Sequence, residues 1–347
     1  MLKKILLILF TVTVIIAFGY VLGPKASIQE LKGEYLQLPK PLTDVEFFID
    51  QVEDTVSQLK PGNRARIVWA DSVNKSKTPI SIVYIHGFGA SHMEGDPVHR
   101  KLAEHFGANL YLARLPEHGI NRENSMEYLS ADILLDAARQ AYMIGKSLGD
   151  SVVVIGTSMG GALSLTLASE RPEMKALVLY SPAIREYGEA LDSFFKPWSK
   201  TYASRYLFED GVKKISRGEE KAGYWSTFYH INGYESLAVL LRSKMVENTF
   251  NEIKQPVFLG YYYKSDSLQD FVVSVPKMNE MYDQLSTPDN LKVLRKFPES
   301  GDHVIASSIT SKDWEGVYYE TVAFLKDIVG MKPIISQQKN PLEIILQ

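Results

Sequence analysis

A serine stands at the centre of a Gly-x-Ser-x-Gly pentapeptide that runs from Gly156 to Gly160. The apolar run VVVI at 152–155 precedes it, and apolar residues typical of a helix follow it over 159–169. A serine on a sharp strand-to-helix turn adopts a strained backbone conformation, and its neighbours must be small to avoid collision. The turn exposes the hydroxyl and directs the free N–H groups of the helix N-terminus at a developing negative charge. The pattern predicts that Ser158 is a nucleophile; the alternative is a glycine-rich turn with an incidental serine.

A second glycine-containing turn lies about seventy residues upstream of this serine. His86, Gly87, Phe88 and Gly89 follow the strand-like run ISIVYI at 80–85. An oxyanion hole needs a second backbone N–H from the loop after an earlier strand, and this turn has the right position. With both turns in place, the chain resembles the α/β-hydrolase superfamily, whose members often carry an HG dipeptide in this loop.

The resemblance implies roles for several residues in the two turns. The backbone N–H groups of Phe88 and Met159 are expected to form the oxyanion hole. The residues expected to support the two motifs are His86, Gly87, Gly156 and Gly160. His86 is expected to position its own loop instead of transferring protons.

The general base implied by the resemblance is a histidine that follows the acid near the C-terminus. Of the seven histidines, only His303 follows a late predicted strand, at 291–297, and a turn. Its expected task is to take the proton of Ser158 and to pass it to the leaving group.

Two aspartates compete for the role of the triad acid, Asp266 and Asp270, and both follow the predicted strand at 257–263. In the superfamily the acid commonly precedes a short apolar pair that leads into a helix, and Asp270 matches this pattern. Asp266 lies nearer the end of the strand, where the spacing also fits. The loop at 264–269 is longer than the resemblance leads us to expect, so both candidates stay open, with Asp270 favoured.

Strands and helices alternate along the chain, as the placement of these residues requires. Strands are predicted at 65–70, 80–85, 109–115, 152–155, 176–180, 257–263 and 291–297, and helices at 45–59, 125–148, 159–169, 275–285 and 314–329. Such alternation predicts a mostly parallel central sheet covered by helices on both faces. The fold class expected is therefore an α/β-hydrolase fold.

The alternation stops between about 183 and 254, where helical and loop patterns occur without a convincing strand. We interpret this segment as a helical cap inserted above the sheet. Its aromatic side chains include Phe194, Phe195, Trp198, Tyr202, Tyr206, Phe208, Tyr224, Trp225, Phe228 and Tyr229. They fit a lid that excludes water and binds apolar substrate groups, and equally the core of a small helical domain.

Composition excludes several classes of function. The net charge of −3, without a basic stripe, argues against a nucleic-acid partner. The chain has no cysteine, which excludes disulfides, thiolate nucleophiles and cysteine-based zinc sites. No cofactor is expected.

Two further groups of residues are candidates for a functional site. His92, His99 and His105 are spaced seven and six residues apart, which does not place all three on one helical face, and no carboxylate pattern completes a metal site. No metal is expected there. The segment 114–119 (RLPEHG) resembles a loop that lines the acyl site in capped lipase-like hydrolases, and a structural turn is the alternative.

The N-terminus carries a candidate membrane segment. Lys3 and Lys4 precede an apolar run from Ile5 to Leu22, followed by Gly23-Pro24. Eighteen helical residues span roughly 27 Å, close to the thickness of a bilayer core. With the lysines in the cytoplasm, the rest of the chain lies outside the inner membrane. An uncleaved anchor is favoured over a cleaved signal peptide, because the apolar run is long and Ala17-Phe18-Gly19 is a poor cleavage site.

The chain thus divides into an anchor or signal (1–24), a spacer with a short helix (25–61), a catalytic domain (62–330) and a tail (331–347) with an apolar cluster of unassigned role. The resemblance implies a serine hydrolase that cleaves carboxylic esters with an apolar acyl or alcohol part, as carboxylesterases and monoacylglycerol-lipase-like enzymes do. Thioesterases, amidases and peptidases use the same residues, and a catalytically silent binding module held at the membrane is the alternative from another class.

Overall fold

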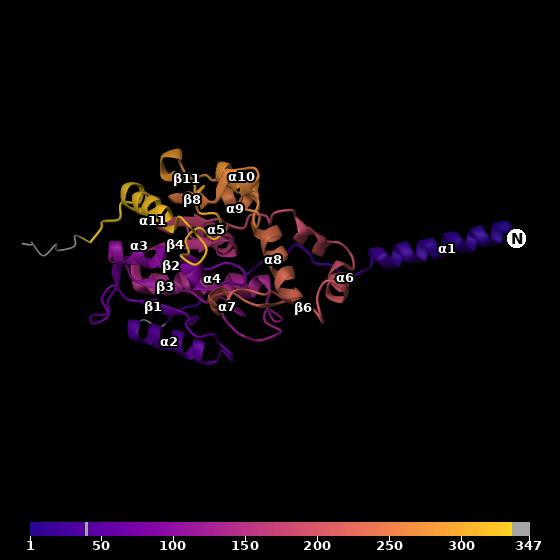
Figure 1. Cartoon of the computed structure of the whole chain (residues 1–347), viewed down its shortest axis with the longest axis horizontal. Helices are drawn as coiled ribbons and strands as arrows, with labels where there is room; N and C mark the ends of the chain where they lie inside the picture. The colour runs from indigo at the N-terminus through magenta and orange to yellow at the C-terminus, as the bar shows by residue number, and fades with distance from the viewer. Residues whose placement is uncertain (39–40, 335–347) are drawn as a thin grey trace, which may run out of the picture.

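The computed structural model describes residues 1–38 and 41–334, and a seven-stranded sheet forms the centre of this part of the chain (Figure 1). Its strands are β1 (Arg66–Val68), β2 (Thr78–Ile85), β3 (Leu110–Leu112), β4 (Gly149–Thr157), β5 (Ala176–Tyr180), β8 (Val257–Tyr261) and β11 (Lys292–Lys296). They lie in the order β1-β3-β2-β4-β5-β8-β11; β1 is antiparallel to β3, and the other neighbours are parallel. The predicted, mostly parallel sheet is confirmed.

Helices cover both faces of the sheet. The main ones are α3 (Val98–Phe106), α4 (Ala131–Leu148), α5 (Met159–Glu170), α10 (Val275–Gln284) and α11 (Trp314–Ala323), which continues into the π-helical η4 (Phe324–Ile328). Val152 and Val154 of β4 belong to the apolar core that contains α4, α5 and α10, whereas Val153 and Ile155 belong to the core that contains α3 and α11. Because both faces of β4 are dry, its sequence is continuously apolar.

The helix before β4 begins later than predicted. The predicted helix covers 125–148, but α4 starts at Ala131, and the side chain of Ser130 accepts a hydrogen bond from the N–H of Ile133 (3.3 Å). The hydroxyl of Ser125 instead donates to the carbonyl of Phe228 (2.6 Å) and joins the loop to the cap segment. The apolar spacing over 125–130 thus comes from a buried loop and not from a helical turn.

The cap segment, residues 183–254, leaves the sheet after β5 and returns at β8. It contains η2 (Ala190–Phe195), α6 (Ser199–Tyr206), β6 (Val212–Lys214), α7 (Glu219–Tyr224), β7 (Phe228–His230), α8 (Ile231–Lys244) and α9 (Glu247–Asn251). The prediction that this segment has no strand is wrong, because β6 and β7 pair as an antiparallel two-stranded sheet. Strands of three residues are too short to show an alternating pattern.

The long loop after β8 is a small hairpin. β9 (Tyr263–Ser265) pairs antiparallel with β10 (Leu268–Gln269), directly before Asp270. The residues that make this loop longer than expected therefore form a hairpin. Asp266 lies at its tip, and Asp270 lies at its base.

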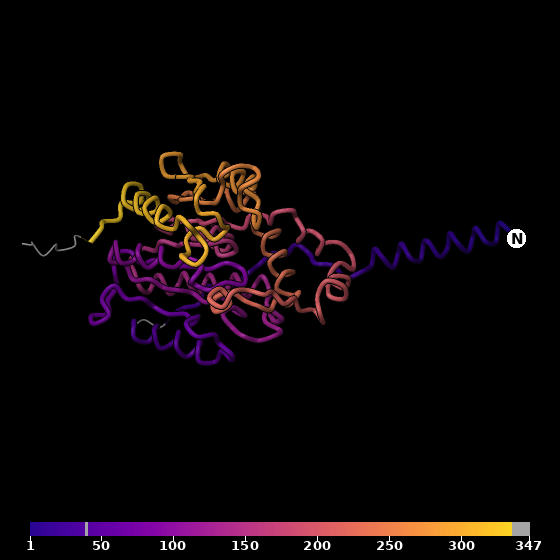
Figure 2. Tube along the Cα trace, in the orientation of Figure 1, coloured from indigo at the N-terminus to yellow at the C-terminus, as the bar shows by residue number. Residues whose placement is uncertain are grey.

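The N-terminal segment forms α1 (Leu2–Val21), a 20-residue helix that has no buried residue and contains an 18-residue window with a mean hydropathy of 2.4. Figures 1 and 2 show it leaving the body of the molecule beside α6 of the cap segment. A membrane anchor and a signal sequence share these properties.

The predicted spacer lies along the body. The hydroxyl of Tyr35 donates to Glu170 (2.7 Å), and the N–H of Gln29 donates to Ser243 (3.1 Å). The helix expected at 45–59 is α2 (Leu42–Asp54). From residue 335 onward the predicted tail, with its apolar cluster, lies outside the described residues.

Candidate active site

Ser158 occupies the turn between β4 and α5. Its φ of 53° and ψ of −121° lie in a region that residues with a side chain rarely adopt. The turn is tight, because a Cβ on Gly160 would collide with the carbonyl of Ile85 and a Cβ on Gly156 with the carbonyl of Gly160. The two glycines of the pentapeptide therefore permit the close approach of α5 to β2 and β4.

The loop after β2 passes directly over this serine. A Cβ added to Gly87 would lie 2.8 Å from the Cβ of Ser158. His86 is fully buried: its Nδ1 donates to the carbonyl of Gly87 (2.9 Å) and its Nε2 accepts from the N–H of Leu115 (3.1 Å). Burial lowers the pKa of His86 well below its ordinary value, so the ring is neutral and both its nitrogens are engaged within the loop.

The two amides expected to form the oxyanion hole lie at this junction. Phe88 and Met159 both line the cavity that contains Ser158. Within the described residues, neither N–H donates a hydrogen bond to a protein acceptor. The N–H of Met159 is free because it belongs to the first residue of α5, where a helix has no internal acceptor.

Asp270 and His303 form a close pair beside the serine. Oδ2 of Asp270 lies 2.6 Å from Nδ1 of His303. Oδ1 of Asp270 accepts hydrogen bonds from the N–H groups of Val272 (2.8 Å) and Val273 (3.0 Å). These two backbone amides orient the carboxylate towards the imidazole.

His303 faces the cavity with its other ring nitrogen. Its Nε2 is buried and has no hydrogen-bond partner among the described residues, and the ring lines the same cavity as Ser158. Burial opposes a charge on His303, but the carboxylate of Asp270 outweighs burial and raises the pKa of His303 above its ordinary value of 6.5.

Asp266 lies outside this arrangement. It is exposed at the tip of the β9–β10 hairpin, where its Oδ1 accepts a hydrogen bond from the hydroxyl of Tyr263 (2.7 Å). The structure therefore brings Ser158, Asp270 and His303 together at the carboxyl ends of the parallel strands and leaves Asp266 in solvent.

Comparison with known proteins agrees with this geometry. A family model described as the alpha/beta hydrolase fold matches residues 80–306. The chain belongs to the alpha/beta hydrolase fold family. No curated protein matches the chain in sequence.

Solved structures show the same fold at low sequence identity. A structure from the metagenome-derived lipolytic enzymes LipS and LipT has a TM-score of 0.61 and 18% identity and covers 78% of this chain and 100% of its own. Monoacylglycerol lipase of Paleococcus ferrophilus has a TM-score of 0.55 and 14% identity, with 77% and 98% covered. A soluble variant of monoglyceride lipase from Saccharomyces cerevisiae, bound to a substrate analogue, has a TM-score of 0.52 and 14% identity, with 76% and 91% covered.

In this alpha/beta hydrolase, a cavity of about 770 Å³ lies between the sheet and the cap segment. Side chains from the cap enclose it together with the loop after β2, mainly Phe88, Leu191, Trp225, Tyr234, Leu237 and Leu241. Of the aromatic residues predicted to form a lid, Trp225 lines this cavity, whereas Phe194 and Tyr229 are buried in the core and Trp198, Tyr202 and Tyr206 are exposed. The aromatic side chains of the cap segment are therefore divided between the wall of this cavity, the core and the surface.

One buried carboxyl in the cavity was not identified from the sequence. Glu94, in η1 (His92–Gly95), accepts a hydrogen bond from the N–H of Gly87. Burial raises the pKa of Glu94 to about 7, and this effect exceeds the opposing influence of the Gly87 N–H and of His303. No motif or spacing marks this residue in the sequence.

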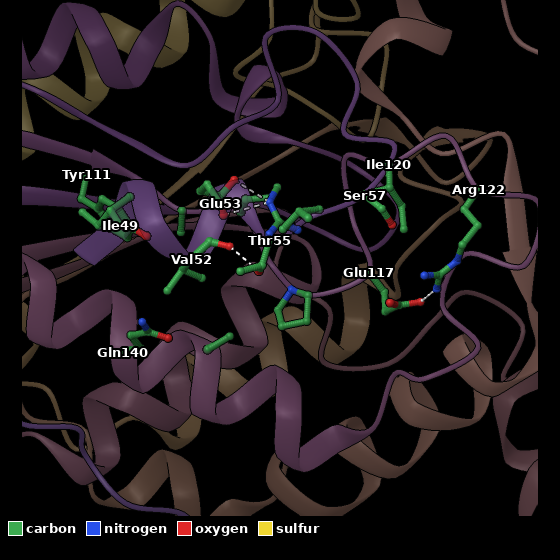
Figure 3. A pocket seen from close by; sticks show the side chains of 15 residues that line it. Ile49, Val52, Glu53, Thr55, Ser57, Tyr111, Glu117, Ile120, Arg122 and Gln140 are labelled. Carbon is green, nitrogen blue, oxygen red and sulfur yellow. Dashed lines mark hydrogen bonds and ion pairs between the residues drawn. The ribbon is translucent and has the colours of Figure 1, made fainter. Parts of the chain in front are cut away.

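The segment 114–119 is a structural turn and lies outside the serine cavity. Arg114 pairs with Glu53 of α2 (2.8 Å), and it also donates to the carbonyl of His118 (3.2 Å). Arg114 and Glu53 line a separate hollow beside α2, where Glu117 also pairs with Arg122 (Figure 3). The expected lining of an acyl site by this loop is not found.

The surroundings of His92 and His99 differ from the prediction in one respect. Asp96 does bring a carboxylate to His92 and His99, with one ligand atom from each within 4.8 Å of the others. However, the guanidinium of Arg100 bonds Asp96 (2.6 Å), and that of Arg66 lies 3.2 Å from Nε2 of His92. Because these two groups already bring positive charge to the cluster, we assign no metal to it. His105 lies apart, beside the hydroxyl of Tyr318 (3.3 Å).

Proposed function

We propose that the chain is a serine hydrolase that cleaves carboxylic esters. The observation that carries this proposal is the buried Asp270–His303 pair, whose free imidazole nitrogen faces the same cavity as Ser158. A serine in a strained turn, an oriented histidine and two amides without a partner in the described part of the chain are the groups that acyl transfer requires.

In the proposed reaction, Oγ of Ser158 attacks the ester carbonyl while Nε2 of His303 takes its proton. Asp270 holds Nδ1–H of His303 and stabilises the imidazolium that forms. The N–H groups of Phe88 and Met159 donate to the oxyanion, and the imidazolium then protonates the departing alcohol. Water, activated by His303, attacks the acyl-enzyme, so the acid leaves and Ser158 regains its proton.

The substrate we propose has an apolar acyl or alcohol part. Apolar side chains from the cap segment and from the body of the molecule make up most of the cavity wall, and such a wall retains apolar groups. Three charged residues of the cap also line it, Glu186, Arg217 and Lys221. The solved structures named above are lipolytic enzymes and monoglyceride lipases, which agrees with this class. The same residues serve thioesters and amides, so the second candidate function within the fold is hydrolysis of those bonds.

We also propose that α1 is a retained anchor and that the catalytic domain, residues 62–330 with the cap at 183–254, lies outside the cytoplasm. Lys3 and Lys4 at the start of α1 favour a cytoplasmic N-terminus. The last turn of α1 bonds the cap, because Nε1 of Trp198 donates to the carbonyl of Gly19 (3.1 Å). Cleavage after α1 would remove this contact.

Labelling with a tagged fluorophosphonate tests the nucleophile. The wild-type chain should be labelled, and Ser158→Ala should lose the label together with about 10⁶-fold of its hydrolysis of p-nitrophenyl esters. Ser267→Ala changes an exposed serine of the β9–β10 hairpin and is the matched control. A folded wild type that remains unlabelled would instead favour the silent binding module.

A further inference from the structure

The last turn of α1 is attached to one short stretch of the cap. Besides the bond from its indole to Gly19, Trp198 donates its backbone N–H to the carbonyl of Pro24 (2.9 Å). The N–H of Ala26 donates to the carbonyl of Phe194 in η2 (2.9 Å). The cap and the end of the apolar helix are thus joined on both sides of Gly23.

Trp198 is held in an unfavourable conformation to make these contacts. Its φ is 64°, in the left-handed region that bulky residues avoid. The indole also lies so close to the chain that a Cβ on Gly23 would collide with it. Trp198 thus combines a close contact with the end of α1 and a backbone conformation that is unfavourable for a bulky residue.

Beyond Trp198, α6 exposes a continuous apolar face. Trp198, Tyr202, Tyr206 and Leu207 are 44%, 59%, 69% and 64% exposed. Tyr202 and Tyr206 are one helical turn apart, and their ring centroids are 4.8 Å from each other. Lys196 and Arg205, which are also exposed, flank this face. Aromatic rings bordered by cations are typical of surfaces that lie at the level of lipid headgroups.

We propose that this cap face (Trp198, Tyr202, Tyr206 and Leu207) docks on the surface of the phospholipid bilayer that α1 crosses. This inference rests on the proposed function in one respect, namely that α1 is retained as an anchor. Because the indole of Trp198 bonds a carbonyl in the last turn of α1, the face starts at the depth where that helix leaves the hydrocarbon. Continuity with the membrane segment thus identifies the occupant of the face as a bilayer.

Docking also brings the cavity close to the lipid. η2 carries Ala190 and Leu191, which line the serine cavity, and its Phe194 binds the segment after α1. Phe271 and Val272, which contact Tyr187 just before η2 and also line the cavity, are more than half exposed. A water-insoluble ester would therefore pass from the bilayer along apolar side chains to Ser158.

A pair of single-cysteine variants tests the docking in the full chain. The protein has no cysteine of its own, so Tyr206→Cys and Tyr319→Cys each carry one environment-sensitive nitrobenzoxadiazole label. Tyr319 is 67% exposed, close to the exposure of Tyr206, and lies in α11 at the end of the molecule away from α1 (Figure 1). Both variants are reconstituted into phosphatidylcholine–phosphatidylglycerol vesicles, with and without brominated lipid.

The label at 206 should emit at shorter wavelength than the label at 319, and brominated lipid should quench it alone. Equal, water-like emission at both positions would overturn the docking. Gly23→Val, in the Tyr206→Cys background, should move Trp198 and reduce the quenching, whereas Gly19→Ala should not, since nothing lies within 4 Å of a Cβ at that position.

Fluorophosphonate labelling of the same vesicles separates the two proposals. Labelling at Ser158 with a water-like signal at 206 would remove the docking and leave the hydrolase. Quenching at 206 without labelling would remove the hydrolase and leave the docking. The spectral readout does not depend on catalysis, so neither result is ambiguous.

Discussion

Asp270 and Asp266 carry the same side chain four residues apart, yet the chain gives them different surroundings. The first is buried against His303 and held by two amides, and the second accepts one hydrogen bond from Tyr263 at the surface. Only a carboxylate in contact with Nδ1 can select the tautomer that leaves Nε2 free to accept the serine proton.

Replacing each aspartate by asparagine therefore makes a matched pair. Asp270→Asn should lower kcat for p-nitrophenyl esters by about 10⁴-fold, because the amide can favour the wrong tautomer of His303 and cannot stabilise its charge. Asp266→Asn should keep kcat within a few fold of the wild type. A comparable loss in both variants would mean that the β9–β10 hairpin, and not the carboxylate at 270, supports the reaction.

Glu94 makes the folded state sensitive to pH. In the unfolded chain this carboxyl loses its proton near its ordinary pKa of 4.5, whereas in the folded protein it keeps the proton up to about 7. The folded state thus binds more protons between these values, and stability falls as pH rises through this window. The loss is complete above about pH 7 and is of the order of 3 kcal/mol.

Glu94→Gln should remove this loss, because glutamine does not titrate and still accepts from the N–H of Gly87. Compared with the wild type, the variant should gain thermal stability at about pH 8 and gain little at about pH 5, measured by the unfolding temperature in detergent. Glu123→Gln, at an exposed position, is the control. An equal shift at both pH values would contradict the buried, titrating carboxyl.

At the scale of elements, α8 forms part of the wall of the cavity that contains Ser158. Leu237 and Leu241 of this helix line the cavity, one turn apart, and face the wall that carries Ser158. α8 also packs against η2, α4 and α5, so its position is set by the core and not by the cavity.

Leu237→Trp should shorten the preferred acyl chain. The larger ring fills part of the cavity, so kcat/KM for long-chain p-nitrophenyl esters should fall by roughly tenfold, the effect of losing one to two buried methylene groups. Acetate and butyrate esters should react at near wild-type rates. Leu237→Met, which conserves volume, is the control, and an unchanged chain-length profile in Leu237→Trp would place the acyl group elsewhere.

At the scale of the whole molecule, the proposed topology puts every residue after Pro24 on one side of a membrane. α1 projects from the body without burying any residue, while the sheet and the cap form one folded unit behind it (Figure 1). An apolar helix of this length is stable in a bilayer and would be costly to expose to water.

Val73→Cys tests this topology in the cysteine-free chain. Val73 is 86% exposed in the loop between β1 and β2, so the new thiol is accessible from solvent. In bacterial spheroplasts, a membrane-impermeant maleimide should label the variant before lysis. Lys4→Cys, at the other end of α1, should react only after lysis, and the reverse pattern would place the catalytic domain in the cytoplasm.

Most of the sheet and the two glycine-containing turns, at Gly87 and at Ser158, can be predicted from the sequence because they depend on local patterns. VVVI at 152–155 must be buried on both faces, and the glycines around Ser158 permit a turn that other residues forbid. Because helices alternate with the strands, the strands run parallel and their carboxyl ends lie at one edge of the sheet. Ser158 and His303 both follow strands at that edge. The apolar α1 is equally visible, since its length and composition alone define it.

Other features exist only in the folded chain, because the pattern of a segment does not determine which groups its side chains contact. The sequence leaves both Asp270 and Asp266 as candidates for the partner of His303, and in the structure Asp270 contacts this histidine. The β9–β10 hairpin, with Asp266 at its tip and Asp270 at its base, consists of strands too short to be predicted. Burial of Glu94 beside Gly87 and the bond from Trp198 to Gly19 are tertiary contacts without a periodic signal. Local patterns determine which helices and strands form. The contacts and the burial of individual side chains depend on how those elements pack, and burial in turn shifts the pKa of groups such as Glu94.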